Sequence, residues 1–556
     1  MNALPDDGFH VFDTTLRDGA QSEGINLTVS DKLGIARLLD DFGVRFIEGG
    51  WPGANPRDTE FFRRAREEID FRHATLVAFG ATRRAGLRVE EDPQVAALLE
   101  AGTEVVQLVA KSHDRHVETA LRTTLDENLR MISDTIGWLR GHGRRVFLDC
   151  EHFFDGYADN PGYALDVVRT AHEAGADVVV LCDTNGGMLP DRVHAVVCEV
   201  LAATDARLGI HAQDDTGCAT ANTLAAVDAG ATHVQCTANG YGERVGNANL
   251  FQVVAALELK RGRTVMPAGA LALMTRTAYA IAELAGQAPP SHEPYVGASS
   301  FAHKGGLHAA AIKVDPALYQ HIEPELVGNT MRMLVSTMAG RASIELKAEE
   351  LGLGLGGDRE TAARLVTRVK ERELQGYAYE SADASLELLI REETGTLGER
   401  PFETEFWRVA VEHRAHGDLR ARVNEAAVEL RVRGRLSLAT AQAPDPVRAL
   451  DLAVRRALGP DSAVLALLRL ADYQVRILDG VGESGSAARV LLTMTDGVEE
   501  WTTVGAAEDV VTAAWQALDD AYVYGLLRSG AGPAAGAGAW AAPRRAREGA
   551  VPGAVG

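Results

Sequence analysis

The sequence predicts an α/β protein whose N-terminal half is a closed (β/α)8 barrel, and the order of its apolar runs is the reason. Eight short runs rich in Val, Ile, Leu and Phe are each followed by a helical pattern, and all but the third, which ends at Phe79-Gly80, end on a polar residue. The run ends lie about 28 to 40 residues apart, which is the length of one strand-plus-helix unit. Eight such units in a row are typical of a TIM barrel, in which functional groups gather where the strands end.

The predicted strands are mostly continuous apolar runs, as expected of parallel strands that are covered on both faces. They are His10–Asp18, Arg45–Gly50, Ala74–Gly80, Val105–Lys111, Arg145–His152, Val178–Thr184, Leu208–Asp214 and His233–Gly240. The alternative is an open doubly wound sheet. No G-x-G-x-x-G pattern follows the first run, which speaks against a dinucleotide-binding sheet.

Three further regions follow the predicted barrel, which we assign to residues 1–265. Residues 266–395 are mostly helical in pattern and predict a linker and helical subdomain, with a long helix over Arg359–Gln375. Residues 396–527 contain two copies of a strand–strand–strand–helix pattern, which predicts an α+β repeat domain for dimerisation or effector binding. Residues 528–556 are rich in Ala, Gly and Pro, which predicts a disordered tail.

Composition and charge narrow the classes of partner. With 556 residues, of which 46% are hydrophobic and 24% charged, the chain is typical of multi-domain globular proteins. Its net charge of −22 argues against a nucleic acid or an anionic membrane as partner, because both select clustered Lys and Arg. The sequence opens without a signal-peptide pattern, and no apolar stretch reaches the ~18 residues of a spanning helix. We therefore expect a cytoplasmic protein.

The end of the seventh run holds candidate metal ligands. His211 and Gln213 are two residues apart on a strand, so their side chains point to the same side. Asp18 and Asn247 fall at the same end of the predicted barrel, and Asn247 lies in a Gly-rich loop that lets backbone approach a ligand. Together these residues indicate a metal site. On its own, a histidine at a strand end is more often structural, and Arg17 beside Asp18 is more often a structural ion pair.

Further polar residues close other predicted strands. Glu48, Glu151 and Thr184 end the second, fifth and sixth runs. A buried carboxylate without a partner is costly, so each must be paired, protonated or functional. We take all three as candidate site residues, with Glu48 as a candidate for substrate binding. His308 follows two glycines and is either a structural histidine or an acid–base group that a mobile loop delivers.

Six segments together resemble the 2-isopropylmalate, homocitrate and citramalate synthase family. They are FDTTLRDGAQ, FIEGGWPGANPRD, DCEHFFDGY, LCDTNGG, ANGYGERVGNANL and FAHKGGLHAAAIKVDP. The likeness covers nearly the whole chain, residues 9–527, including the repeat domain. EGGWPG, EHFFDGY and FAHKGG are most similar to the citramalate synthase members, although substrate choice within the family rests on a few pocket side chains.

The resemblance implies a metal-dependent Claisen-type condensation of acetyl-CoA with a small 2-keto acid, which is pyruvate in the citramalate synthases. It implies that Arg17 contacts the substrate and stabilises developing negative charge. It further implies that Asp18, His211 and Asn247 bind a divalent metal, which acts as a Lewis acid on the keto acid.

The resemblance assigns the remaining roles as well. Glu151 and His308 are expected to take part in acid–base chemistry, and Thr184 is expected to hold the keto-acid carboxylate. The family also implies a homodimer whose repeat domain binds an end-product amino acid. Isoleucine is the first candidate for this effector and leucine the second.

One departure from the family pattern concerns the metal site. Members usually show His-x-His-Asn-Asp at this strand end, whereas this chain has His211-Ala212-Gln213-Asp214-Asp215. The amide oxygen of Gln213, or a water molecule, would then replace the second histidine. A set of three oxygen ligands and one nitrogen ligand favours Mg2+ or Mn2+, with Zn2+ or Co2+ as alternatives.

Three alternative functions stay open. A 2-isopropylmalate or homocitrate synthase would need a roomier pocket for its keto acid. A lyase on the same barrel is disfavoured because such lyases generally lack the repeat domain, and no reactive-cysteine loop follows the eighth run. A catalytically inactive amino-acid sensor is disfavoured because Arg17 and the expected metal ligands other than Gln213 match the family pattern.

Overall fold

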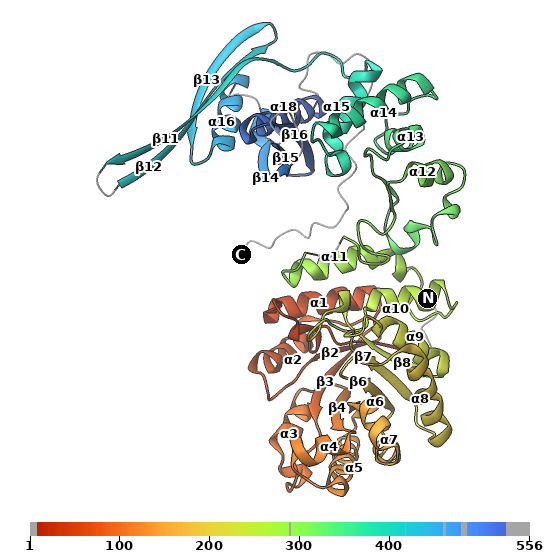
Figure 1. Ribbon diagram of the computed structural model, residues 1–556. Helices are drawn as coiled ribbons and strands as arrows, with labels where there is room; N and C mark the ends of the chain where they lie inside the picture. Colours follow the sequence, from red (N-terminus) through yellow and green to blue (C-terminus); the bar gives the residue numbers. More distant parts are fainter. Residues whose placement is uncertain (1–7, 289–290, 417–418, 460–462, 480–485, 530–556) are drawn as a thin grey trace. The chain divides into compact units, whose positions relative to one another are not determined.

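The computed structural model describes residues 8–288, 291–416, 419–459, 463–479 and 486–529 (Figure 1). The tail predicted over residues 528–556 lies, apart from its first two residues, outside this range. Among the described residues, no helix is both long and apolar enough to cross a membrane. Contacts divide the chain into two compact units, Met1–Phe301 with Ile322–Thr330 and Ala302–His321 with Met331–Gly556.

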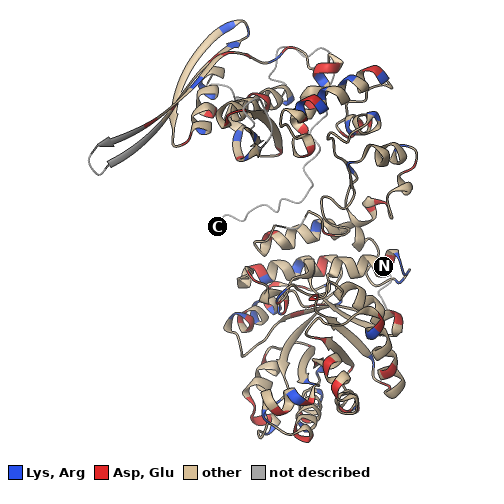
Figure 2. Cartoon of the chain, viewed as in Figure 1, with Lys and Arg blue, Asp and Glu red and all other residues tan. Residues whose placement is uncertain are grey.

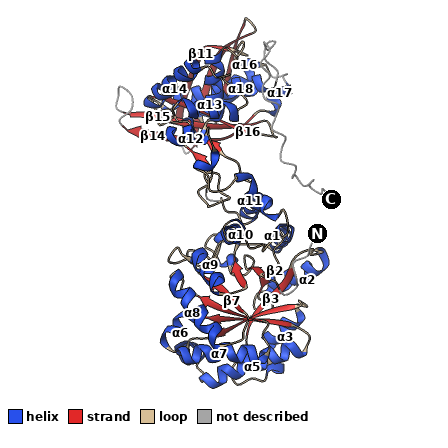
Figure 3. Ribbon diagram, turned by 90° about the vertical axis from the view of Figure 1, so that its right-hand side faces the viewer, coloured by secondary structure: helices blue, strands red, loops and turns tan. Residues whose placement is uncertain are grey.

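The first unit is built on a closed barrel of eight parallel strands, which confirms the predicted fold class (Figure 3). The strands are β1 (His10–Asp13), β2 (Phe46–Gly50), β3 (Thr75–Ala81), β4 (Val105–Lys111), β5 (Arg145–Glu151), β6 (Val178–Asp183), β7 (Leu208–Ala212) and β8 (His233–Cys236). β1 closes the ring by pairing with β8, where Phe12 lies opposite Gln235.

Helices surround the barrel, and both charge signs are interspersed along them (Figure 2). The helices are α1 (Val29–Phe42), α2 (Pro56–Glu68), α3 (Pro93–Glu100), α5 (Leu125–Gly141), α7 (Pro161–Ala174), α8 (Pro190–Ala203), α9 (Ala219–Ala229) and α10 (Leu250–Leu259), with the short α4 (Asp114–His116) and α6 (Phe153–Asp159) in loops. Outward strand residues such as Val11 and Ile47 belong to one large buried cluster with these helices. Phe12, Phe46, Phe147 and other side chains form a separate buried cluster inside the barrel. The barrel interior at this level is therefore a packed core rather than a channel.

The first strand ends earlier than the sequence predicts. We expected it to reach Asp18, but β1 stops at Asp13. The chain then turns, because the Thr14 carbonyl accepts backbone hydrogen bonds from Arg17 at 3.2 Å, Asp18 at 2.9 Å and Gly19 at 3.0 Å. Arg17 and Asp18 therefore lie in a tight turn that follows the strand.

Two segments beyond the eighth strand complete the first unit. α11 (Met274–Leu284) packs on α1, and Thr275 on α11 donates to the carbonyl of Val327 at 2.8 Å. The Asn329 side-chain amide donates to the carbonyls of Tyr295 at 2.8 Å and Gly297 at 3.0 Å. The domain limits of 265 and 395 rest on sequence pattern rather than on contacts, and they stay predictions.

The second unit begins with a short parallel pair and a helical region. The pair is formed by β9 (Ala302–His303) and β10 (Arg332–Met333). The helices are α12 (Gly306–Ile312), α13 (Arg341–Glu350), α14 (Arg359–Leu374) and α15 (Asp383–Thr394). α14 matches the predicted long helix to within one residue, and it begins where the Asp358 carboxylate accepts from the backbone of Glu360 and Thr361.

The rest of the second unit is the predicted repeat of three strands and a helix. The first copy consists of β11 (Glu403–His416), β12 (Leu419–Val432), β13 (Arg435–Ala443) and α16 (Pro446–Leu458), and the second, after the short α17 (Ala463–Leu467), of β14 (Arg469–Asp479), β15 (Ser486–Thr495), β16 (Glu500–Ala507) and α18 (Val510–Arg528). Each copy forms its own antiparallel sheet, with its middle strand second in sequence. α16 packs on the first sheet and α18 on the second. The Trp407 and Trp515 rings stack between the copies at 5.6 Å.

Candidate active site and metal centre

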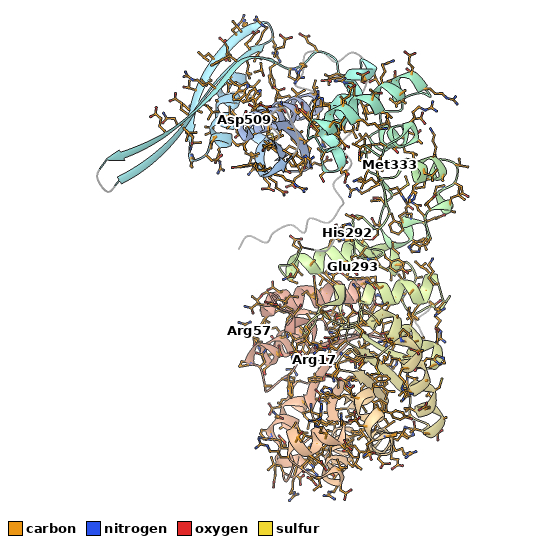
Figure 4. The ribbon with its side chains drawn as sticks, viewed as in Figure 1. Arg17, Arg57, His292, Glu293, Met333 and Asp509 are labelled. Atoms are coloured by element: carbon orange, nitrogen blue, oxygen red, sulfur yellow. The ribbon has the colours of Figure 1, made fainter. Side chains whose placement is uncertain are left out.

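A cavity of about 740 Å3 lies at the carboxyl ends of the barrel strands. Six of the residues predicted from the sequence line it: Arg17, Asp18, Glu151, Thr184, His211 and Gln213. Figure 4 shows Arg17 within the barrel, among the strand ends. The structure therefore brings most of the predicted site together in one place, although these residues are spread over nearly 200 positions of the chain.

Arg17 is held in one orientation by three neighbours. Its Nε donates to Glu48 Oε2 at 2.6 Å, and its guanidinium lies over the Phe79 ring, 4.0 Å from the centroid. Its Nη1 lies 3.6 Å from Asp18 Oδ1. Burial lowers the pKa of Arg17, but the surrounding carboxylates, Glu48 first among them, outweigh this and raise it. The result is a permanent cation whose plane is fixed at the edge of the cavity.

Four side chains converge on the position expected for the metal. Asp18 Oδ2 lies 3.2 Å from His211 Nε2 and 3.3 Å from Gln213 Nε2. Gln213 forms an isolated antiparallel bridge with Asn247, which places that loop residue beside the end of β7. All four residues are at least 94% buried.

The donor atoms of this cluster fit a divalent cation. Gln213 Oε1 and Asn247 Oδ1 are buried, and neither has a hydrogen-bond partner among the residues described. Such acceptors are costly to bury unless something else coordinates them. With the Asp18 carboxylate and the His211 imidazole they offer three oxygens and one nitrogen, a set that suits oxygen-preferring divalent ions. Gln213 turns its Nε2 toward Asp18 here, so its oxygen would reach a metal after a rotation of the amide. The described chain contains no cluster of three His, Cys, Asp or Glu side chains suited to a metal, because two of the four donors here are amides.

The charges around Asp18 and His211 shift the pKa values of both groups. Burial opposes the charged form of Asp18, but the Arg17 guanidinium and the hydrogen bond with His211 lower the pKa of this carboxyl below its usual range. Burial also lowers the pKa of His211, but the Asp18 carboxylate outweighs it and raises the pKa. A cation at this position would displace the imidazole proton, so metal binding and proton release are coupled.

The other predicted residues of the first unit have clear partners. Glu48 is fully buried beneath Arg17, and its Oε2 also accepts from Thr14 Oγ1 at 2.5 Å. Glu151, the last residue of β5, forms an ion pair with Lys111. Thr184 Oγ1 accepts from the backbone N–H of His152 at 2.8 Å. Glu48 therefore contacts Arg17, whereas Glu151 and Thr184 face the cavity.

His308 belongs to the second contact unit, whereas the cavity residues belong to the first. It lies on α12, is solvent-exposed, and stacks on Tyr319 with ring centroids 4.1 Å apart. Its acid–base role stays a prediction.

Sequence reasoning missed two buried polar residues beneath the cavity. Asp149 on β5 lines the cavity, and burial together with the nearby Glu48 raises its pKa to about 7. Gln235 on β8 donates to Asp149 Oδ1 at 2.9 Å. The signal was available, because each is the single polar residue inside an otherwise apolar strand segment, Phe147–Cys150 and Val234–Cys236.

Three family models match successive parts of the chain. Residues 8–281 match the sequence model of the HMGL-like family, residues 295–376 match the homocitrate synthase post-HMGL domain-like family, and residues 380–526 match the LeuA allosteric (dimerisation) domain. These matches agree with a barrel, a connecting region and a repeat domain in this order.

Full-length relatives are more specific. An (R)-citramalate synthase of Streptomyces coelicolor is 69% identical over 95% of this chain and 98% of the relative. One of Aquifex aeolicus is 45% identical over 93% of this chain and 98% of the relative. A 2-isopropylmalate synthase of Methanocaldococcus jannaschii is 30% identical over 92% of this chain and 94% of the relative. The resemblance inferred from the sequence is thus confirmed, and the chain belongs to the citramalate synthase branch of the 2-isopropylmalate, homocitrate and citramalate synthase family.

Proposed function

We propose that the chain condenses acetyl-CoA with pyruvate and water to give (R)-citramalate and CoA. The observation that carries the proposal is the fixed Arg17 guanidinium beside the cluster of Asp18, His211, Gln213 and Asn247, in a chain 69% identical to an (R)-citramalate synthase. A bound divalent ion would polarise the keto group of the acceptor as a Lewis acid. We favour Mg2+ or Mn2+ because three of the four donors are oxygens.

The protein's own groups account for the remaining steps. Thr184 Oγ1 already accepts a backbone hydrogen bond, so its own hydrogen is available to the acceptor's carboxylate. We assign to Glu151, one of the carboxylates that line the cavity, the removal of a proton from the acetyl methyl, with His308 as its partner. The new carbon–carbon bond turns the keto oxygen into an alkoxide, whose charge Arg17 offsets. Hydrolysis of the thioester then releases CoA and makes the sequence irreversible in practice.

The test is CoA release from acetyl-CoA with pyruvate, 2-ketobutyrate, 2-ketoisovalerate and 2-ketoglutarate offered separately. Pyruvate should give the highest kcat/KM, because one extra methylene typically changes specificity by ~10- to 200-fold. A higher value with 2-ketoisovalerate or 2-ketoglutarate would reassign the chain to the isopropylmalate or homocitrate branch. Asp18→Asn should abolish turnover, and Asp41→Asn, at a carboxylate 56% exposed on α1, is the matched control.

We also propose a homodimer that binds an amino-acid effector through the repeat domain. The match to the LeuA allosteric (dimerisation) domain supports this, as does a row of exposed apolar side chains on β14: Tyr473, Val475 and Ile477 are 37%, 44% and 57% exposed. Alternate residues of a strand share a face, so the three form one apolar strip. Calorimetry with isoleucine, leucine and threonine, on the full chain, tests the effector. Isoleucine should bind and raise the apparent KM for pyruvate, typically by ~5- to 150-fold.

A further inference from the structure

We infer that Gln235 and Asp149 are positioning residues that hold His211 in the tautomer whose Nε2 is free to bind the metal. This rests on the metal centre proposed above. The three side chains form a continuous hydrogen-bonded chain across the inside of the barrel, ending at the cluster of Asp18, His211, Gln213 and Asn247. All three are buried, with exposed fractions of 6% for His211, 1% for Gln235 and 4% for Asp149.

The first link of the chain joins neighbouring strands. His211 on β7 and Gln235 on β8 are register partners, so their side chains project from the same level of the barrel. His211 Nδ1 lies 2.8 Å from Gln235 Oε1. An amide oxygen only accepts hydrogen bonds, so Nδ1 carries a proton, and the metal takes Nε2 when that nitrogen gives up its own proton. Nε2 is the atom that faces Asp18, at 3.2 Å.

The second link fixes which way the Gln235 amide faces. Its Nε2 lies 2.9 Å from Asp149 Oδ1, and the ionised form of this carboxyl only accepts hydrogen bonds. If the amide were turned over, its N–H2 would face His211 and its oxygen would face the carboxylate. β5 and β8 are not neighbours in the ring, so this bond spans the barrel interior. Asp149 therefore sets the amide, and the amide sets the imidazole.

A histidine that binds a metal usually donates its other N–H to a fixed acceptor, and loss of that acceptor typically weakens metal binding by ~10- to 100-fold. Gln235→Leu should reduce Mn2+ affinity by about this factor. Asp149→Leu should act in the same direction, because the amide loses its anchor. Asp149→Asn should retain most of the affinity, because its carbonyl oxygen still accepts from the amide of Gln235.

The barrel offers a matched control in Gln107. This glutamine lies on β4, is fully buried, and neither atom of its amide has a hydrogen-bond partner among the described residues. Gln107→Leu therefore makes the same chemical change inside the same barrel without touching the chain of hydrogen bonds. It should leave Mn2+ affinity within twofold of the wild type.

The experiment combines two measurements at pH 8 on the full-length protein. Calorimetric titration with Mn2+ gives the affinity of each variant, and 15N chemical shifts of labelled histidine in the metal-free protein give the His211 tautomer. The wild type should show the Nδ1–H form, and Gln235→Leu should lose it. Unchanged Mn2+ affinity and tautomer in Gln235→Leu, or equal weakening in Gln107→Leu, would overturn the inference. If the wild type binds no Mn2+, the proposed metal centre fails, and the tautomer measurement alone still decides the positioning role.

Discussion

Glu48 contacts Arg17 rather than the cavity, so substitutions of Glu48 should lower activity through the position of Arg17. Glu48 is fully buried, and its Oε2 accepts from Arg17 Nε at 2.6 Å and from Thr14. Glu48→Gln keeps the shape and an acceptor oxygen but removes the charge. A hydrogen bond to a charged group contributes ~1.5–3 kcal/mol and a neutral one ~0.5–1.5 kcal/mol. The expected loss is therefore about 1–2 kcal/mol, or roughly 5- to 30-fold in kcat/KM.

Glu48→Ala should have a larger effect, because it removes the acceptor as well as the charge. Leaving one partner of a buried ion pair unmatched typically costs ~3–5 kcal/mol. We expect more than a hundredfold loss in kcat/KM, measured as CoA release with pyruvate, and a lower urea midpoint. The matched control is Glu67→Gln, at a side chain 62% exposed that pairs with Arg63 on α2, since exposed pairs contribute ~0–1 kcal/mol. Wild-type kcat/KM in both Glu48 variants would refute a positioning role.

Further predictions concern the metal, the dimer and pH. Gln213→His should shift metal preference toward Zn2+ and Co2+, measured by competitive metal binding; an unchanged preference would mean that residue 213 is not a ligand. Ile477→Asp should convert the dimer to monomer in sedimentation velocity, while Leu87→Asp, at a residue 37% exposed in the barrel unit, should not. Burial and the neighbouring Asp519 raise the pKa of Asp520 to about 7. Between about pH 4 and 7 the folded chain thus holds a proton that the unfolded chain has lost, so stability falls as pH rises. Asp520→Asn should raise the urea midpoint relative to wild type more at pH 8 than at pH 5, and equal differences would contradict this protonation.

The sequence predicts the barrel well because its signal is local and repeated. Every barrel strand is a short, mostly apolar run, and a helix follows each of them along the chain. The grouping of six candidate residues around one cavity is predicted as well, since a closed barrel brings strand ends together whatever their separation along the chain. The roles of these residues stay predictions. The end of β1 is the exception, because the turn at Thr14 depends on a carbonyl that accepts three N–H groups, which an apolar pattern does not reveal.

The partners of the site residues are harder to predict than the site residues themselves. That Glu48 contacts Arg17, and that Gln235 reaches Asp149 across the barrel, depends on strand register and side-chain direction. Hydrophobic periodicity carries no information about strand register or side-chain direction at these positions. The two contact units are also invisible in the sequence, because the packing of α11 on α1 joins segments that the pattern of helices and strands treats as separate regions.

The barrel unit is not one continuous stretch of chain, and this limits how such proteins can be recombined. Residues 322–330 belong to it although residues 302–321 do not, and they are tied back by Thr275 and Asn329. The chain therefore passes between the units at three places. A chimaera that exchanged the barrel at a single junction would separate these nine residues from the rest of the barrel unit, which they contact. A chain that crosses between its units three times is best exchanged as a whole. The two citramalate synthase relatives match it over 93–95% of its length.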